Sequence, residues 1–292
     1  MRAHAYRLLF ALFFSYALTA EELPPPLYSF SLFGEYVRVN PATFWSSGVE
    51  GETLRYHQTD ISFSYTHPFC STFGLVFGAN WVQTLVDWPE NPDFNETLFN
   101  YIGFSTGGFI KPSEEWMWTA TATAFLDTEI LSLVDYALYQ VVLNGQFICS
   151  KKLELDFGFI LELGLNKEKI WPILGFVYSP TPEWKLSAVY PVNVSLEYKI
   201  LPCLKAAAAL RFLRNRHRVL PEEPNSQGIF EYQDWGGEGD LIYAPYPWLS
   251  IKGYVGSTFD GYLKMTNRHD EDAHYFKYGG AFYSGVSALL SY

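Results

Sequence analysis

Two stretches of the sequence carry side chains that are typical of metal or catalytic sites. The run from His269 to His274 places imidazoles and carboxylates within six residues, and a divalent cation uses such groups as ligands. The run lacks the order of acidic residues of a calcium loop, and a charged surface loop explains it without a ligand. His57 lies three residues from Asp60, but a nucleophile needs an adjacent base and an orienting third group. We therefore expect no catalytic residues, no metal and no cofactor.

A basic group stands out in an otherwise acidic chain. Arg214, Arg216, His217 and Arg218 occur together, whereas the whole chain has a formal net charge of −11. Nucleic-acid binding depends on neutralising phosphates with Lys and Arg, so nucleic acid is not an expected partner. The basic group has two interpretations that remain open: an anchor for lipid phosphates, or ordinary solvated charge at the base of a loop.

The N-terminus has the layout of a secretory signal peptide. Arginines at the start are followed by an apolar run from Leu8 to Leu18 and then by small residues. The run is about half as long as the roughly 20 residues that a helix needs to cross a bilayer. We expect residues 1–20 to be removed, although cleavage after Ala17 fits the small-x-small rule better. Residues 21–292 then form one exported domain.

Alternation of apolar and polar residues is the main structural signal in this domain. A period of two is typical of a strand with unlike faces. No stretch after the signal peptide has 18 consecutive apolar residues, so helical membrane spans are not expected, and aromatic residues make up 18% of the chain. A soluble β-sandwich also alternates, with its apolar face inward. The clearest alternating segments are 72–81, 116–124, 153–164 and 192–200.

Connections between the alternating segments favour a membrane barrel over a sandwich. Short turns on one side and long loops on the other are typical of antiparallel outer-membrane β-barrels. One strand before the first loop, two around each turn and one after the last loop predict 14 strands, with 12 as the alternative because segments near Pro191 are short. The short turns are 67–71, 111–115, 149–152, 179–183, 201–204 and 244–247, and the predicted long loops are 40–56, 85–96, 127–134, 164–170, 215–228 and 259–274.

Aromatic residues at predicted strand ends indicate a girdle at the membrane interface. Six of them lie beside the short turns: Phe69, Trp116, Tyr178, Trp184, Tyr198 and Trp248. The last strand alternates and ends on Tyr292, which resembles the C-terminal insertion signal of Gram-negative outer-membrane proteins. This resemblance implies recognition by the barrel-insertion machinery. The stretch from Trp184 to Tyr198 resembles uncharacterised families of outer-membrane β-barrel domains of unknown function. Neither resemblance implies an activity.

The same alternation assigns charged residues to the interior of the barrel. Both signs are present, so these side chains either line a water-filled passage or close into an ion-pair network, because burying charges without partners is costly. The expected lumen-lining residues are Asp60, Glu154, Asp156, Glu162, Lys185, Glu197, Lys199, Lys205, Arg211 and Lys252.

Cys70, Cys149 and Cys203 lie in or beside short turns, which face the periplasm in such a barrel. Turns two apart on a wide barrel are too distant for internal bridges. The odd count leaves at least one thiol unpaired if the others bridge. Free thiols and disulfides to other envelope proteins both remain open.

Taken together, these features predict an integral outer-membrane β-barrel of a Gram-negative bacterium. We expect a passive channel for small solutes or a structural envelope protein, with outer-membrane lipid as its surroundings. A secreted soluble β-sandwich that binds a ligand is the alternative, and an outer-membrane hydrolase is the least favoured class.

Overall fold

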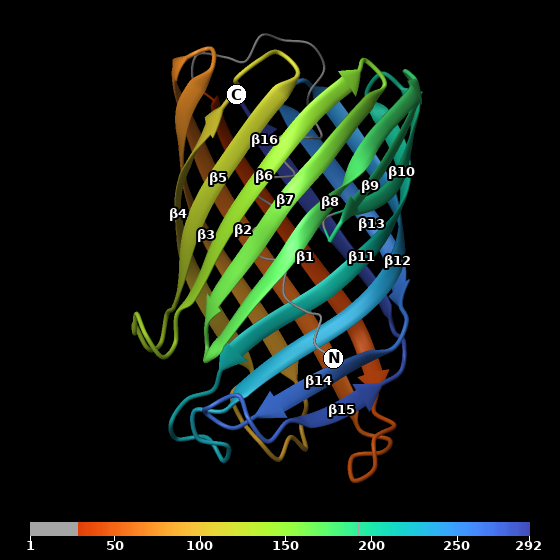
Figure 1. The fold of residues 1–292 in the computed structure, drawn as a ribbon. Helices are drawn as coiled ribbons and strands as arrows, with labels where there is room; N and C mark the ends of the chain where they lie inside the picture. The colour runs from red at the N-terminus through yellow and green to blue at the C-terminus, as the bar shows by residue number, and fades with distance from the viewer. Residues whose placement is uncertain (1–28, 192) are drawn as a thin grey trace.

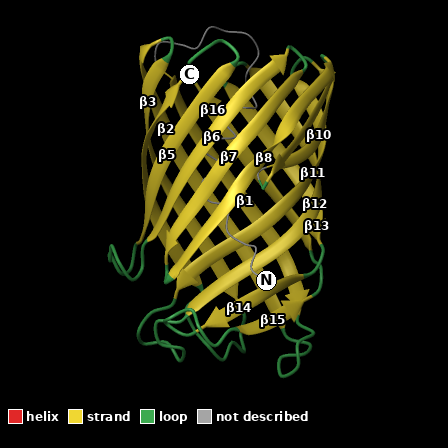
Figure 2. Cartoon of the chain, in the orientation of Figure 1, coloured by secondary structure: helices red, strands yellow, loops and turns green. Residues whose placement is uncertain are grey.

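A computed structural model describes residues 29–191 and 193–292 as an all-β protein (Figures 1 and 2). The predicted signal peptide lies outside the described residues. Within them, no helix has the length and apolar character needed to cross a membrane. The strands are β1 (Ser29–Thr43), β2 (Thr53–Cys70), β3 (Phe73–Asp87), β4 (Leu98–Ile110), β5 (Trp116–Asp127), β6 (Leu138–Ser150), β7 (Leu153–Gly164), β8 (Lys167–Thr181), β9 (Trp184–Tyr190), β10 (Asn193–Leu201), β11 (Leu204–Arg218), β12 (Ile229–Tyr246), β13 (Leu249–Thr258), β14 (Gly261–Thr266), β15 (His274–Tyr278) and β16 (Phe282–Ser291).

Fourteen of these strands close into an antiparallel barrel. Neighbouring strands from β1 to β12 pair in chain order, β12 then pairs with β13, β13 with β16, and β16 with β1. The remaining hairpin, β14–β15, extends the ring from the lower part of β12, where Ile229–Gln233 pair with β14 rather than β13. The prediction of 14 strands is confirmed, and the sandwich alternative is wrong.

The two ends of the barrel differ as the turn pattern predicts. All six predicted short turns join adjacent strands at one end, the short-turn end, which is at the top of Figure 1. The predicted loop at 164–170 is wrong. Leu165 and Asn166 form a two-residue turn with φ of 50° and 57°, the left-handed geometry that matches the twist of a hairpin. The predicted loop at 259–274 contains β14 and the start of β15.

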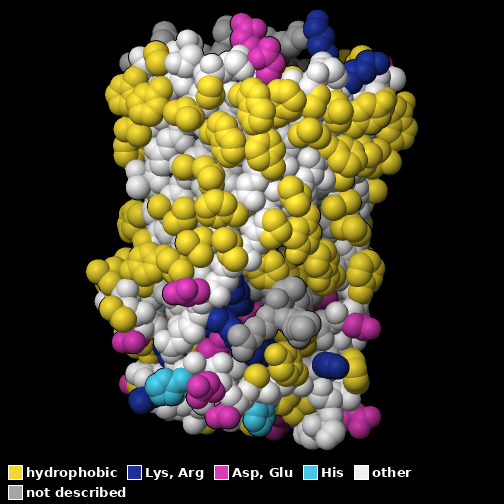
Figure 3. All heavy atoms as spheres, in the orientation of Figure 1, with side chains coloured by type: hydrophobic (Ala, Val, Ile, Leu, Met, Phe, Trp, Pro, Cys, Tyr) yellow, Lys and Arg dark blue, Asp and Glu magenta, His cyan; other side chains and the backbone are white. Residues whose placement is uncertain are grey.

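Apolar side chains cover the outside of the barrel. Ile61, Phe104, Leu174 and Val255 project outward and are exposed, while their neighbours along each strand point inward. Figure 3 shows hydrophobic side chains over the upper two-thirds of the visible face, with charged side chains toward the long-loop end and at the short-turn rim. An apolar band around a closed barrel is the surface that an outer-membrane protein presents to lipid. The molecule is a barrel of the outer-membrane type.

The long-loop end is filled by strands that turn into the barrel. The last residues of β11 and the first of β12 lie against the inner faces of the opposite wall: the ring of Tyr101 on β4 stacks on His217 of β11 at 4.5 Å. Tyr56 on β2 stacks on Tyr232 of β12 at 3.8 Å. Buried apolar residues from β1 to β4, β11 to β15 and β16 complete this dry core.

Behind this inward-turned layer, the barrel wall overlaps itself. β9 and β10 are short and end about half-way down the wall (Figure 1), and β8 pairs with β9 only from Leu174 onward. Below them the inner face of β7 and β8 covers the outward face of β11 and β12. Arg214 on β11 lies on the same outward strand face as Phe212. It nevertheless contacts Glu162, on the inner face of β7, at 3.4 Å, so β7 covers this part of β11 from outside. We call this overlap the seam.

Candidate functional site: the barrel interior and its closed end

All ten residues predicted for the lumen lie on inner strand faces. Five of them surround the upper interior near the short-turn end. Four of these five form pairs across neighbouring strands: Lys185 on β9 lies opposite Glu197 on β10, and Lys199 on β10 lies opposite Lys205 on β11. Glu154 on β7 accepts a hydrogen bond from Gln146 on β6. Asp60, Asp156 and Glu162 are buried. Arg211 and Lys252 belong to a denser cluster lower in the interior.

This denser cluster, the lumen network, joins five strands through Arg211. Its Nε donates to Glu238 at 2.6 Å and its Nη2 to Glu35 at 3.0 Å. The guanidinium also lies over the Tyr254 ring, 4.2 Å from its centroid. Lys252 is 3.4 Å from both Glu238 and Asp240. The hydroxyls of Tyr254 and Tyr283 donate to Glu35 and Glu238.

The opposite wall of the interior is polar but contains few charges. Inner positions of β2 to β6 carry hydroxyl and amide groups, among them Ser62, Asn80, Thr121, Gln140 and Asn144. Each of these side chains has a buried polar atom without a hydrogen-bond partner in the described part of the chain. Buried polar groups are almost always hydrogen-bonded, to protein or to water. These atoms therefore call for hydrogen-bond partners beyond the described residues.

The closed end is held by hydrogen bonds as well as by the aromatic stack. Asn215 on β11 donates to the hydroxyl of Thr84 on β3. The Tyr101 hydroxyl donates to the backbone carbonyl of Arg216 at 3.4 Å. Arg218 donates to the carbonyl oxygens of Asp135, Gln227 and Arg268 at 2.7 to 2.9 Å. These contacts connect the inward-turned layer to the opposite wall and to the loops around it.

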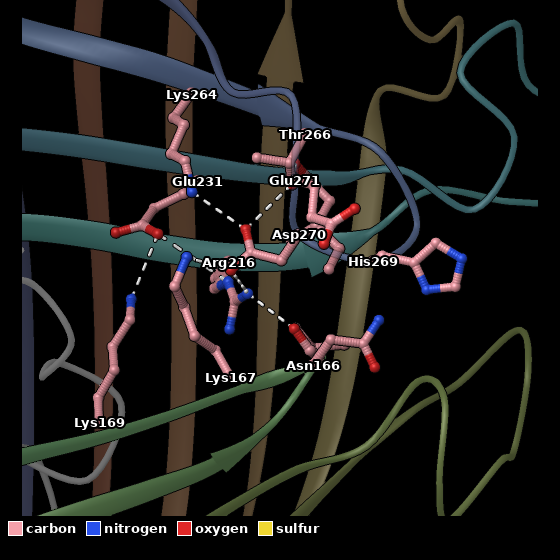
Figure 4. Close-up of polar contacts among 12 residues, drawn as sticks. Asn166, Lys167, Lys169, Arg216, Glu231, Lys264, Thr266, His269, Asp270 and Glu271 are labelled. Atoms are coloured by element: carbon pink, nitrogen blue, oxygen red, sulfur yellow. Dashed lines mark hydrogen bonds and ion pairs between the residues drawn. The ribbon is translucent and has the colours of Figure 1, made fainter.

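Charged residues fill the seam on the other side of this layer (Figure 4). Glu231 on β12 lies in register between Arg216 on β11 and Lys264 on β14. Arg214 donates to Glu231 at 2.7 Å, and Lys169 on β8 lies 3.4 Å from the same carboxylate. The seam network consists of Glu162, Lys167, Lys169, Arg214, Arg216, Glu231, Lys264 and Asp270.

Asp270, in the loop between β14 and β15, anchors this loop to the seam. It pairs with Lys167, with Lys264 at 3.0 Å and with Arg216 at 3.1 Å. Burial alone would raise the pKa of Asp270, but the charge of Arg216 and the hydrogen bonds from the two lysines hold its pKa below the usual value. Asp270 is thus kept ionised as the counter-ion of three cations.

The seam corrects both interpretations of the basic group. Arg214, Arg216, His217 and Arg218 are all buried, so they are neither solvated nor on the lipid surface. A signal for this was present in the sequence. On the outward face of β11, Leu210 and Phe212 are followed by three arginines, and a change from apolar to charged on one strand face indicates a new environment. Glu35, Glu231, Glu238 and Asp240 were not singled out from the sequence.

The histidines and acids suspected of chemistry are not assembled into a site. His57 projects outward and is hydrogen-bonded to Tyr36 at 3.0 Å, whereas Asp60 projects inward from the same strand. In the described residues, no group of three or more His, Cys, Asp or Glu side chains is arranged to hold a metal ion.

The predicted rim residues are located at the short-turn end. The predicted girdle residues Phe69, Tyr178, Trp184, Tyr198 and Trp248 are exposed, and Trp116 packs against Phe147 and Phe157. Tyr292 follows β16, and its backbone exchanges hydrogen bonds with Phe30 on β1. Cys70, Cys149 and Cys203 are free thiols.

Comparison with known proteins identifies relatives of the chain. It is 30% identical to an uncharacterized protein of Chlamydia pneumoniae over 92% of its own length and 89% of that protein. The chain belongs to this chlamydial family. A further member, from Chlamydia trachomatis, is 29% identical over the same shares of both chains. No family model matches the sequence.

Among solved structures, the chlamydial family member is similar to outer-membrane channels. An outer membrane channel of Pseudomonas putida F1 superposes with a TM-score of 0.48 at 8% identity, covering 93% of this chain and 97% of that one. The porin KdgM gives 0.39 at 10% identity, covering 90% and 99%.

Proposed function

We propose that this protein is an outer-membrane channel for small polar solutes, closed in the described state by the inward-turned layer of β11 and β12. The observation that carries the proposal is the set of interior polar atoms that have no hydrogen-bond partner within residues 29–191 and 193–292, on Ser62, Thr121, Gln140 and Asn144. Leaving such groups dry costs free energy, so water occupies the interior. A barrel of this width has room for a water-filled passage.

The proposed channel needs its closed end to move. The closing layer is attached to the opposite wall by the apolar core with its Tyr56–Tyr232 stack, and by the contacts of His217 with Tyr101 and of Asn215 with Thr84. It lies at the end where β11 is no longer paired with β10. An element with one unpaired edge is displaced at lower cost than a strand that is paired on both sides, because fewer backbone hydrogen bonds break. Displacing it connects the wet interior to the long-loop end.

A disulfide lock tests this movement. With the three natural cysteines replaced by Ser, Thr84→Cys and Asn215→Cys join the closing layer to β3, since the native side chains are in hydrogen-bond contact. The matched control joins two strands of the same wall, Ser105→Cys and Thr123→Cys, whose hydroxyls are 2.8 Å apart. We expect planar-bilayer conductance when the first pair is reduced and none when it is oxidised, whereas the control conducts in both states.

A second candidate function, a structural envelope barrel without conduction, is favoured by the dry core of the closed end. The same experiment separates the two. Equal conductance of the locked and reduced protein, or no conductance and no uptake of small sugars by proteoliposomes in either state, would overturn the channel proposal. The second of these results would support the structural role.

A further inference from the structure

The connection between β5 and β6 carries an exposed aliphatic patch at the long-loop end. Leu131, Leu133 and Val134 are 75%, 65% and 79% exposed, which is more than the 58% of Phe104 on the lipid-facing side of the barrel wall. Single exposed apolar residues are common on protein surfaces, but a contiguous group of them marks a site of contact with a membrane or a partner. We call residues 128–137 the β5–β6 loop and its three exposed aliphatic residues the aliphatic patch.

Hydrogen bonds order the backbone of the β5–β6 loop around this patch. The carboxylate of Asp127 accepts from two loop amides at 2.8 and 3.1 Å. The Ser132 hydroxyl accepts from the amides of Val134 and Asp135 at 3.3 and 3.2 Å, and the Ser132 amide donates to the Ile130 carbonyl at 2.7 Å. Burying an amide without an acceptor in an apolar environment is costly. The tip of this loop meets much of that requirement within the protein itself.

The end of the loop next to β6 is fixed to the closed end of the barrel. Arg218 on β11 donates to the carbonyl of Asp135 at 2.7 Å. Tyr136 is buried, and its hydroxyl donates to the backbone of the loop between β11 and β12 at 3.4 Å. The Tyr139 hydroxyl on β6 donates to the carbonyl of Leu133 at 2.7 Å. The aliphatic patch is therefore held in place relative to the barrel wall.

The aliphatic patch continues the apolar band of the barrel. At the base of the loop, Ile102 on β4 lies opposite Leu126 on β5 on the outward face, and Ile102 is exposed. In Figure 1 the β5–β6 loop bends away from the barrel at the left, and Figure 3 shows hydrophobic side chains projecting there, at the lower edge of the band. Glu129 and Asp135 are exposed and flank the patch. This arrangement fits the boundary between headgroups and acyl chains, where amphipathic segments lie.

We propose that the aliphatic patch is a membrane anchor that inserts Leu131, Leu133 and Val134 among the lipid acyl chains of the leaflet at the long-loop end. Burial of these side chains removes apolar surface from water, which is favourable. Lipid fits the patch better than a second copy of the chain, because a stable protein interface takes about 20–30 residues a side. In barrels of the outer-membrane type this end faces the cell exterior. The anchor does not depend on conduction by the barrel.

A fluorescent label on the patch tests the proposal in the full chain, folded into phosphatidylcholine vesicles. With the three natural cysteines replaced by Ser, Leu133→Cys carries an environment-sensitive nitrobenzoxadiazole group. We expect blue-shifted emission and quenching by lipids with a doxyl group on the acyl chain, as for Phe104→Cys on the barrel wall. Glu90→Cys is the aqueous control, because Glu90 is exposed in the loop between β3 and β4 at the same end. A Leu133 label that behaves like the Glu90 label overturns the proposal, as does a blue shift that is lost when the protein is diluted with lipid, which assigns the patch to a second copy.

A variant without a label gives an independent measurement. Leu131→Ser, Leu133→Ser and Val134→Ser, made together, should lower the urea midpoint of the protein in vesicles, because three side chains lose their contact with lipid. The heat-modifiable band in SDS gels reports the folded fraction. Phe104→Ser should also lower the midpoint, whereas Glu90→Ser should leave it unchanged. Substitutions of residues that face water are usually nearly neutral, so an unchanged midpoint for the triple variant overturns the proposal.

Discussion

Removing Arg211 is expected to be among the most damaging single substitutions in the barrel interior. Arg211 compensates Glu35 and Glu238 through hydrogen bonds of 3.0 Å and 2.6 Å. At an effective dielectric constant of about 20, a pair of charges 3 Å apart attracts by roughly 5 kcal/mol before desolvation. Arg211→Met leaves both carboxylates buried beside Asp240 with only Lys252 nearby. We expect a loss of about 3–5 kcal/mol in the free energy of unfolding.

The assay is urea unfolding of the barrel in lipid vesicles, followed by tryptophan fluorescence and by the heat-modifiable band. Removing the whole set of charges, in Arg211→Met with Glu35→Gln and Glu238→Gln, should recover most of the loss, because replacing a complete buried ion pair is often nearly neutral. Arg55→Met is the surface control and should cost less than about 1 kcal/mol. If Arg211→Met unfolds like this control, or if the triple variant is less stable than the single one, the reasoning is refuted.

Three further predictions concern strand packing, pH and the rim thiols. Gly158→Val should prevent folding, because an added Cβ overlaps the Leu143 carbonyl oxygen on β6, whereas Gly253→Val meets nothing within 4 Å and should fold; the folded band in SDS gels measures both. Burial and neighbouring loop carboxylates raise the pKa of Glu96 to about 8. The folded state therefore holds a proton that the unfolded state releases near pH 4.5, so stability falls as pH rises from about 4.5 to 8. Glu96→Gln should remove this slope and stabilise the protein at pH 8 by on the order of 1 kcal/mol, since water partly screens the half-buried group; identical slopes would contradict the assignment. The rim cysteines should give higher-mass species in non-reducing gels of intact envelopes that collapse with reductant, and a single monomer band in both conditions would rule out this disulfide partner.

Much of the ring of strands could be predicted because local signals specify it. Alternation defines the two faces of each strand, and Pro-containing segments such as 244–247 mark the turns. The inward turn of β11 and β12 could not be predicted in this way. Alternation shows that Arg214 and Phe212 share a face, but not that another part of the same sheet covers Arg214. That packing depends on the neighbouring β9–β10 hairpin, whose strands are too short to separate the lower part of β11 from β7 and β8.

The loop predicted at 164–170 illustrates a second limit. Its Gly, Asn and Lys residues are typical of loops, but the same composition suits a two-residue turn when Leu165 and Asn166 adopt positive φ. Composition alone does not decide between a long loop and a tight turn. The register of β7 with β8, in which Gly164 lies opposite Lys167, leaves room only for the turn.

The unpaired stretch of β8 has a consequence for association between molecules. An exposed strand edge invites another chain to add a strand, and natural proteins prevent this with Lys and Pro. Here Lys167 and Lys169 point their charges inward from the stretch, into the seam, and Pro172 has no backbone donor. Strand addition between two barrels along this edge of β8 is thereby disfavoured.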